Sequence, residues 1–263
     1  MIATTVGGRL PPSQQSASAE SPTWAVRARA AVAAQERAGL DLLAVAVADL
    51  TAPPDAAATV AVWQAASAGT QRPVKAVLPG PFSGALTAGS AVPAHLSEWT
   101  RAVNAAARAL AAAGAPWIEI DEPALVERKG DWPLAREALV TVAADVTAPL
   151  ALATWGGDVL GLDGLLGLPF QLFHLDFVAG PRNWTLVDTF PRGPSLGLGI
   201  VDARSTTLEY AASLGNVLWR ATQTISPARL HVHPNMPLDA LPAPVAEAKL
   251  ALVAQVVHAA GAV

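Results

Sequence analysis

Short hydrophobic runs alternate with longer Ala-rich segments along the whole chain. The short runs have the length and the branched aliphatic content of buried strands, and turn-forming or polar residues follow them. They predict eight strands, at 2–6, 42–48, 74–78, 117–121, 150–154, 170–177, 196–201 and 229–233. The Ala-rich segments predict helices at about 24–38, 55–69, 94–113, 131–145, 158–166, 183–189, 206–224 and 242–260.

The segment 94–113 has the periodicity of a helix that packs against a sheet. One of its faces carries the apolar side chains of Leu96, Trp99, Val103 and Leu110. Trp63 and Trp219 occupy similar positions in their own segments, and we expect all three tryptophans to pack in the core.

Eight strand–helix pairs without a long insertion predict a single (β/α)8 TIM barrel that spans residues 1–263 as one domain. The alternative is a doubly wound open sheet, but no G-x-G-x-x-G follows the first strand and no phosphate-binding loop of the G-x-x-x-x-G-K type occurs. In a barrel of this kind the chemistry lies at the carboxyl ends of the strands. Polar residues gather at these strand ends in this chain.

Composition narrows the class of partner. The 263 residues have a net charge of -4, no Cys and no basic run, so we expect no nucleic-acid or anionic-membrane partner. No window of about 18 residues is free of strongly polar side chains, so we expect no membrane span. The first residues lack a signal-peptide pattern, which favours a cytoplasmic protein with a small-molecule partner.

Four motifs occur in the order known from one enzyme family. The run WIEIDEPAL at 117–125 is close to the signature I-x-I-D-E-P-A-L, and similar matches occur at 35–41, 74–81 and 197–205. With them the chain resembles the C-terminal catalytic barrel of the cobalamin-independent methionine synthases, as a short member of that family.

The resemblance implies a zinc site that this sequence does not preserve. In the family a His, two Cys and a Glu hold zinc, which activates the homocysteine thiol for methylation by methyltetrahydrofolate. Here Ala153, Trp155 and Met236 stand in the segments for the His and Cys ligands, and Asp176 stands in place of the Glu. We therefore expect no metal ligands and no tightly bound cofactor. Zinc would need an altered His/Asp set made of His174, Asp176 and His233.

Other family positions have also changed. The acidic residue that holds the homocysteine amino group falls within 45–47, with Asp49 as the nearest carboxylate. Ala203 replaces a His, and Gly8 replaces a Ser. Asp121 is the residue of this amino-acid-binding group that clearly persists.

Strand-end positions supply the candidate site residues. Strands four, six and eight contribute to the same interior layer, so Asp121, Asp176 and His233 are expected to converge. The candidates for proton transfer are His233, Asp176 and His174. The candidates for substrate binding are Asp121, Glu122, Gly7, Gly8, Trp155, Asp202 and Arg204. Trp155 either lines or plugs the pocket, and Arg204 either clamps an anion or forms a surface ion pair.

Three functions remain open at this point. The first is a diverged methyltransferase that uses a methylated pterin or a methylated corrinoid, with a separate protein as possible methyl carrier. The second is a cofactor-free lyase or decarboxylase, as in the related uroporphyrinogen decarboxylases, with Asp121 and a His as acid and base. The third is a non-catalytic small-molecule-binding subunit.

Overall fold

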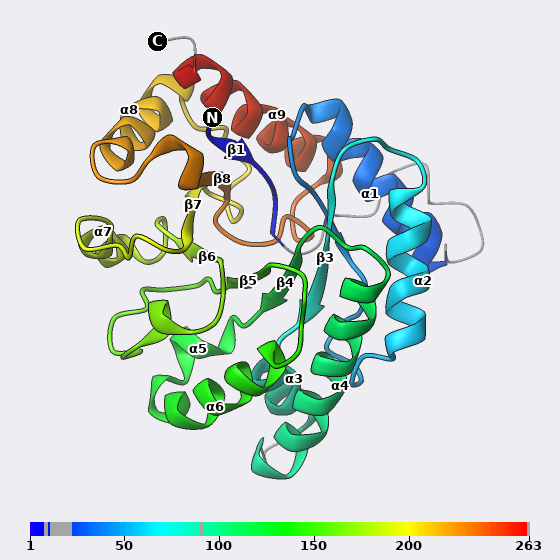
Figure 1. The fold of residues 1–263 in the computed structure, drawn as a ribbon. Helices are drawn as coiled ribbons and strands as arrows, with labels where there is room; N and C mark the ends of the chain where they lie inside the picture. Colours follow the sequence, from blue (N-terminus) through cyan, green and yellow to red (C-terminus); the bar gives the residue numbers. More distant parts are fainter. Residues whose placement is uncertain (8–9, 11–22, 90–91, 262–263) are drawn as a thin grey trace.

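One parallel eight-stranded sheet organises the chain. The computed structural model describes residues 1–7, 10, 23–89 and 92–261. The strands follow the order β1-β8-β7-β6-β5-β4-β3-β2. The sheet curls into a barrel with the helices around its outside (Figure 1), which confirms the predicted fold class.

All eight predicted strands are present, although most are shorter than the apolar runs from which they were predicted. They are β1 (Ala3–Thr4), β2 (Leu43–Ala46), β3 (Val74–Pro79), β4 (Ile118–Asp121), β5 (Leu150–Ala153), β6 (Leu172–Asp176), β7 (Ser195–Val201) and β8 (Leu230–Pro234).

The strands β1 and β2 stand at the two ends of this order and meet through a short seam. The backbone N–H of Leu42 donates to the carbonyl of Thr4 at 3.0 Å. The backbone N–H and the hydroxyl of Thr4 both donate to the Asp41 carboxylate, at 2.9 and 2.8 Å. The Thr4–Asp41 pair thus joins β1 to the start of β2, where the two strands form no ladder of backbone hydrogen bonds.

The helices confirm the predicted alternation of elements except between β5 and β6, and they correct several bounds. They are α1 (Trp24–Ala38), α2 (Ala56–Ser67), α3 (Pro81–Ala88), α4 (Val92–Ala112), α5 (Ala124–Glu127), α6 (Trp132–Ala143), α7 (Trp184–Val187), α8 (Ala211–Thr222) and α9 (Ala243–Gly261). The helix predicted at 158–166 is wrong. Gly161 and Gly164 have φ values of 91° and 77°, a left-handed conformation that interrupts a helix.

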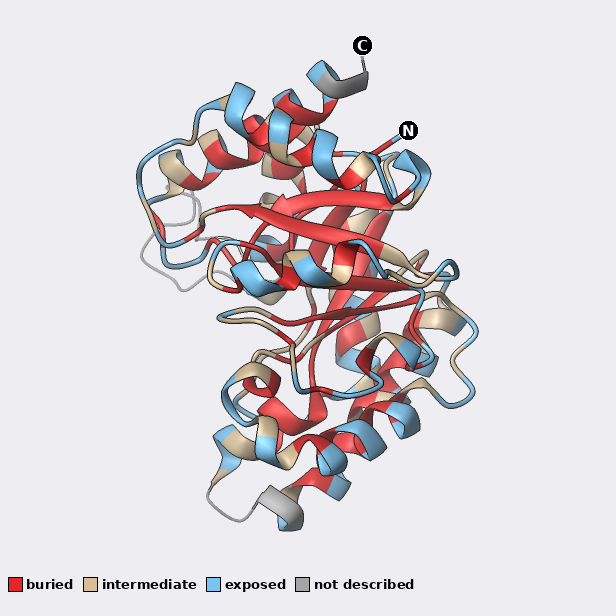
Figure 2. Cartoon of the chain, turned by 90° about the vertical axis from the view of Figure 1, so that its left-hand side faces the viewer, coloured by how far each residue is buried: buried red, intermediate tan, exposed pale blue. Residues whose placement is uncertain are grey.

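The strands are buried along their length, and the helices are buried on the side that faces the sheet (Figure 2). The predicted face of α4 packs in the core as expected, with Trp99 only 1% exposed. Trp63 is also buried, but the prediction for Trp219 is wrong, because its side chain is 65% exposed.

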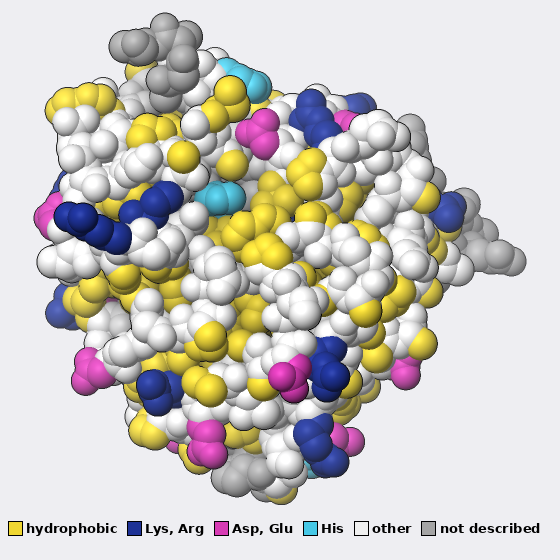
Figure 3. Space-filling view, viewed as in Figure 1, with side chains coloured by type: hydrophobic (Ala, Val, Ile, Leu, Met, Phe, Trp, Pro, Cys, Tyr) yellow, Lys and Arg dark blue, Asp and Glu magenta, His cyan; other side chains and the backbone are white. Residues whose placement is uncertain are grey.

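One face of the molecule shows charged side chains of both signs. On the face drawn in Figure 3, basic and acidic side chains lie in small separate groups around a more hydrophobic middle. In the part of the chain that the structure describes, no helix is both long enough and apolar enough to cross a membrane.

Candidate ligand pocket and barrel interior

A hollow opens at the carboxyl ends of the strands, where the barrel fold places its chemistry. Its volume is about 410 Å³ when the space open to solvent is included. The space that can hold the centres of water-sized molecules is only about 50 Å³, well below the roughly 300–1,000 Å³ of typical small-ligand pockets. The lining residues are Ala46, Ala48, Asp49, Leu50, Val77, Pro79, Asp121, Pro123, Trp155 and Pro237.

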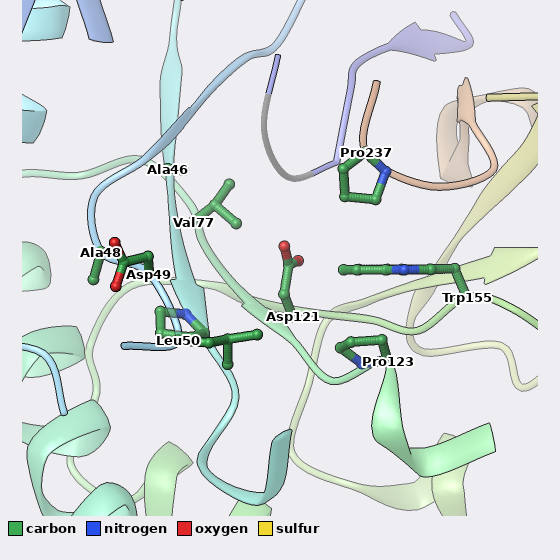
Figure 4. A pocket seen from close by; sticks show the side chains of 10 residues that line it. Ala46, Ala48, Asp49, Leu50, Val77, Asp121, Pro123, Trp155 and Pro237 are labelled. Carbon is green, nitrogen blue, oxygen red and sulfur yellow. The ribbon is translucent and has the colours of Figure 1, made fainter. Parts of the chain in front are cut away.

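Asp121 lies in the middle of this lining (Figure 4). It is the last residue of β4 and pairs in register with Pro79 of β3 and Ala153 of β5. Because side chains alternate along a strand, Asp121 faces the barrel interior together with Glu119. The structure therefore places the Asp of the sequence signature at the pocket.

Trp155 follows β5 and borders the same hollow. Figure 4 shows its ring extending toward Asp121, with Pro123 and Pro237 to either side in that view. The Trp155 ring is half-buried and borders the hollow without filling it. Of the two roles expected for Trp155, the structure favours lining the pocket.

Glu122 has a structural role that the sequence did not reveal. Its carboxylate accepts the backbone N–H groups of Phe82 and Ser83, at 2.8 and 2.9 Å, and the Ser83 hydroxyl at 2.6 Å. These groups form the first turn of α3, which favours a carboxylate at its N-terminus. Burial nevertheless raises the pKa of Glu122 to about 7. With both oxygens engaged by α3, Glu122 is not a direct substrate ligand, which corrects its assignment.

Asp176 joins the loops that follow three strands. Its buried carboxylate accepts the backbone N–H groups of Gly156, Val178 and Ala179 at 2.8–2.9 Å. The amide of Asn235 donates to both of its oxygens at 3.1 Å. These contacts fix the rim of the barrel mouth and leave Asp176 poorly suited to the proton transfer expected of it.

Asp202 and Arg204 lie at the same rim. The Asp202 carboxylate accepts the backbone N–H of Arg204 at 2.9 Å and so closes a tight turn. The Arg204 guanidinium, with its side chain 53% exposed, lies 3.8 Å from the Asp176 carboxylate. The ion pair expected as the alternative for Arg204 is thus present, and neither residue lines the hollow.

Of the two glycines predicted in the first loop, only Gly7 can be placed. A Cβ atom there would lie 3.5 Å from Oε1 of Glu119, so Gly7 faces the barrel interior. Gly8 lies outside the described residues.

A buried ionic network fills the centre of the barrel. Lys75 of β3 and Glu119 of β4 are fully buried, with Nζ 2.5 Å from Oε2. Nε2 of His174 lies 3.1 Å from the same carboxylate oxygen and 3.4 Å from the Lys75 ammonium. The rings of His174 and His233 meet edge to face, with centroids 4.3 Å apart.

The interior histidines are held neutral. Burial and the nearby charge of Lys75 lower the pKa of His231 to about 4 and that of His233 to about 3, and they hold the pKa of His174 well below its usual value. These lowered pKa values disfavour the proton-transfer role predicted for His174 and His233. His174 does contact a carboxylate, but the same site contains Lys75.

Asp121, Asp176 and His233, which the sequence predicts to converge, do not form a metal site. Within residues 1–7, 10, 23–89 and 92–261, no three His, Asp or Glu side chains are arranged to hold a metal ion. His233 packs on His174, while Asp176 is occupied by loop N–H groups. The donor set therefore does not fit the zinc that the family resemblance implies.

The position of the His174 ring requires a residue without a side chain at position 197 on the neighbouring strand. A Cβ atom on Gly197 of β7 would lie 2.1 Å from Nδ1 of His174. We expect Gly197→Ala to lower the free energy of unfolding by about 1–3 kcal/mol, since the buried ring must move. Urea denaturation measures this loss.

Gly215→Ala in α8 is the matched control. A Cβ atom there meets nothing within 4 Å, and Ala favours a helix. Equal stability changes for the two variants would contradict the predicted packing of His174 on Gly197.

One family model matches a large part of the chain. Residues 56–220 match the family model described as cobalamin-independent synthase, N-terminal domain. The motifs resemble the C-terminal catalytic barrel of the family, whereas this match is to the model of its N-terminal domain. The match supports the family.

Two relatives illustrate the extent of the similarity. The 5-methyltetrahydropteroyltriglutamate–homocysteine methyltransferase of Parvibaculum lavamentivorans is 36% identical over 132 residues, which are 47% of this chain and 17% of that protein. The methionine synthase of Methanothermobacter marburgensis is 29% identical over 157 residues, 59% of this chain and 50% of that protein. The matched segment thus spans half or less of each relative.

Solved structures show the same fold. A B12-independent methionine synthase from Shewanella sp. W3-18-1, in complex with selenomethionine, has a TM-score of 0.79 at 17% identity and covers 98% of both chains. A methyltransferase from Methanosarcina mazei has a TM-score of 0.71 at 13% identity and covers 97% of this chain and 93% of its own.

Proposed function

Because the chain belongs to the cobalamin-independent methionine synthase family, we propose that it is a diverged methyltransferase barrel that binds a small amine-bearing substrate beside Asp121. It works without the thiolate zinc site of the family. The observation that carries this proposal is the hollow at the strand ends with Asp121 in its middle.

The chemistry follows from the side chains that border the hollow. A carboxylate beside an apolar wall binds and orients an ammonium group through charge-assisted hydrogen bonds. The prolines and Trp155 provide that wall. The methyl donor remains a pterin or a corrinoid, and a separate carrier protein is a possible source of the methyl group.

The lyase alternative has less support. It needs a histidine beside Asp121 as the acid–base partner, but no histidine is among the described residues that line the hollow. The binding-subunit alternative uses the same pocket as the methyltransferase. A methyl-transfer assay with candidate donors separates these two functions.

Asp121→Asn tests the pocket. The substitution keeps the shape of the side chain and removes its charge, so we expect at least tenfold weaker binding of amine-bearing ligands, as for the loss of a hydrogen bond to a charged group, about 1.5–3 kcal/mol. Calorimetric titration with L-methionine, L-homocysteine and 3-(methylthio)propylamine measures the effect. Equal binding of every ligand by variant and wild type would refute the proposal.

Activity provides a separate test. Without a zinc thiolate site, the isolated chain is expected to show no substantial methyl transfer from methyltetrahydrofolate to homocysteine. A thiol with a pKa of about 8.5 is mostly protonated at neutral pH and then reacts slowly. Rapid product formation in this assay would count against the loss of thiol activation.

A further inference from the structure

We propose that Glu122 and residues 80–83, the turn that begins α3, form a pH-sensitive latch at the edge of the hollow. Ionisation of the Glu122 carboxyl group loosens this latch, and protonation keeps it closed. The inference rests on the proposed function only where it treats the hollow as a ligand pocket, because the latch itself is a property of the fold.

The latch joins two segments that are far apart in the chain. Oε1 of Glu122 accepts the backbone N–H of Phe82, and Oε2 accepts both the backbone N–H and the hydroxyl of Ser83. The Ser83 oxygen in turn accepts the backbone N–H of Ala124 at 3.2 Å. A Cβ atom on Gly80 would lie 2.1 Å from Cδ of Glu122. The turn therefore packs directly on the carboxyl group.

Both segments of the latch border the hollow. Pro79 comes directly before the turn, Asp121 and Pro123 flank Glu122 in the chain, and all three line the hollow. The backbone N–H of Gly80 donates to the carbonyl of Asp121 at 2.8 Å, which extends the pairing of β3 with β4 up to this edge. A movement of the turn therefore changes the edge of the hollow between these two strands.

Glu122 differs from the other buried acid of the same segment in the charge of its partners. Glu119 is buried against the Lys75 ammonium. Glu122 is also fully buried, but its three hydrogen bonds come from neutral groups. Burial of a carboxyl group without an opposite charge favours its neutral form. This effect outweighs the three hydrogen bonds, so the pKa of Glu122 rises to about 7.

The other titratable groups around the latch face away from Glu122. Glu119 and Asp121 face the barrel interior, where Lys75 pairs with Glu119, whereas Glu122 faces α3. Helix α3 itself has no titratable residue, and α4, α5 and α6 pack against it. On these helices His95 is half-buried, near the C-terminal end of α3. The exposed ones are Glu98, Arg101 and Arg108 on α4, Glu127 on α5, and Arg136 and Glu137 on α6. Glu122 is thus the group whose ionisation changes the charge at the latch.

The direction of the pH effect follows from the two states of the latch. When the turn opens, water reaches the carboxyl group, and the pKa of Glu122 returns toward its usual value of 4.5. The closed latch therefore binds the proton more tightly than the open latch. Opening becomes easier as the pH rises from 4.5 to 7, by up to about 300-fold over the whole interval, and changes no further above it.

Amide hydrogen exchange, measured by NMR on the full chain, tests the latch. After correction for the intrinsic pH dependence of exchange, the amides of Gly80, Phe82 and Ser83 are expected to open at least tenfold more often at pH 7.5 than at pH 5.5. Global unfolding changes in the opposite direction, because the interior histidines make the fold less stable at acid pH. Opening that is unchanged or less frequent at pH 7.5 would overturn the proposal.

Variants assign the effect to Glu122. Glu122→Gln is neutral at every pH, so the three amides should be protected equally at pH 5.5 and 7.5. Ser83→Ala removes one donor to the ionised form and should make opening at pH 7.5 more frequent than in the wild type. Asp55→Asn is the matched control, because Asp55 is an exposed acid that caps α2 through the backbone N–H of Ala58. A pH effect that persists in Glu122→Gln would overturn the role of Glu122.

These outcomes separate the latch from the proposed function. The exchange measurement uses no ligand, so it decides on the latch even if L-methionine, L-homocysteine and 3-(methylthio)propylamine all fail to bind. In that case the proposed function fails alone. If Phe82 and Ser83 respond to pH but Gly80 does not, the link between the latch and the hollow is overturned while the proposed function stands.

Discussion

Lys75→Met is expected to lower the free energy of unfolding by about 3–5 kcal/mol, because it leaves the buried Glu119 carboxylate without its positive partner. Both side chains are fully buried, and the ammonium lies 2.5 Å from the carboxylate. The loss should appear as a lower midpoint in urea denaturation followed by circular dichroism. This is the largest single-residue effect that we expect.

Two controls separate this effect from a general loss of charge. The double variant Lys75→Met with Glu119→Leu removes both ions and should recover much of the loss, since a buried ion pair is often replaceable by apolar residues. Arg37→Met breaks an exposed pair with Glu247 and should cost less than about 1 kcal/mol. A Lys75→Met variant as stable as Arg37→Met would contradict the buried network.

Stability is expected to fall steeply between pH 6.5 and 4.5. His174, His231 and His233 have lowered pKa values in the fold, so the unfolded chain, with ordinary values near 6.5, binds up to three more protons there. Their contribution is therefore present above pH 6.5 and is lost as the pH falls. Glu122 opposes this trend, because its pKa is raised to about 7 and the folded state binds its proton first.

The net difference is about two protons, which corresponds to about 2–3 kcal/mol per pH unit. Denaturation at a series of pH values measures this slope. His231→Leu should reduce the slope by about one proton, or about 1.4 kcal/mol per pH unit. Stability that is independent of pH over this range would show that the three histidines are not held neutral.

The strands and the pocket Asp could be predicted from local sequence. Each barrel strand is buried on both sides, so a short apolar run identifies it without knowledge of its neighbours. The position of Asp121 followed from the end of one such run and from the WIEIDEPAL motif. Both features are carried by consecutive residues.

The roles of the polar side chains could not be predicted, because they depend on partners that are distant in the chain. Glu122 caps α3, whose first turn lies about forty residues earlier. Asp176 is occupied by Asn235 and by loop N–H groups. Alternation along β4 places Glu119 and Asp121 on one side of the strand, but the pairing of Glu119 with Lys75 depends on the register of β3 and β4.

Zinc content tests the central claim most directly, since Ala153, Trp155 and Met236 stand at the expected ligand positions and the described residues hold no alternative set of three His, Asp or Glu ligands. The measurement is elemental analysis of the full chain, purified without chelators and without a metal-affinity tag. We predict far less than one zinc ion per chain. About one tightly held zinc ion per chain would contradict the account.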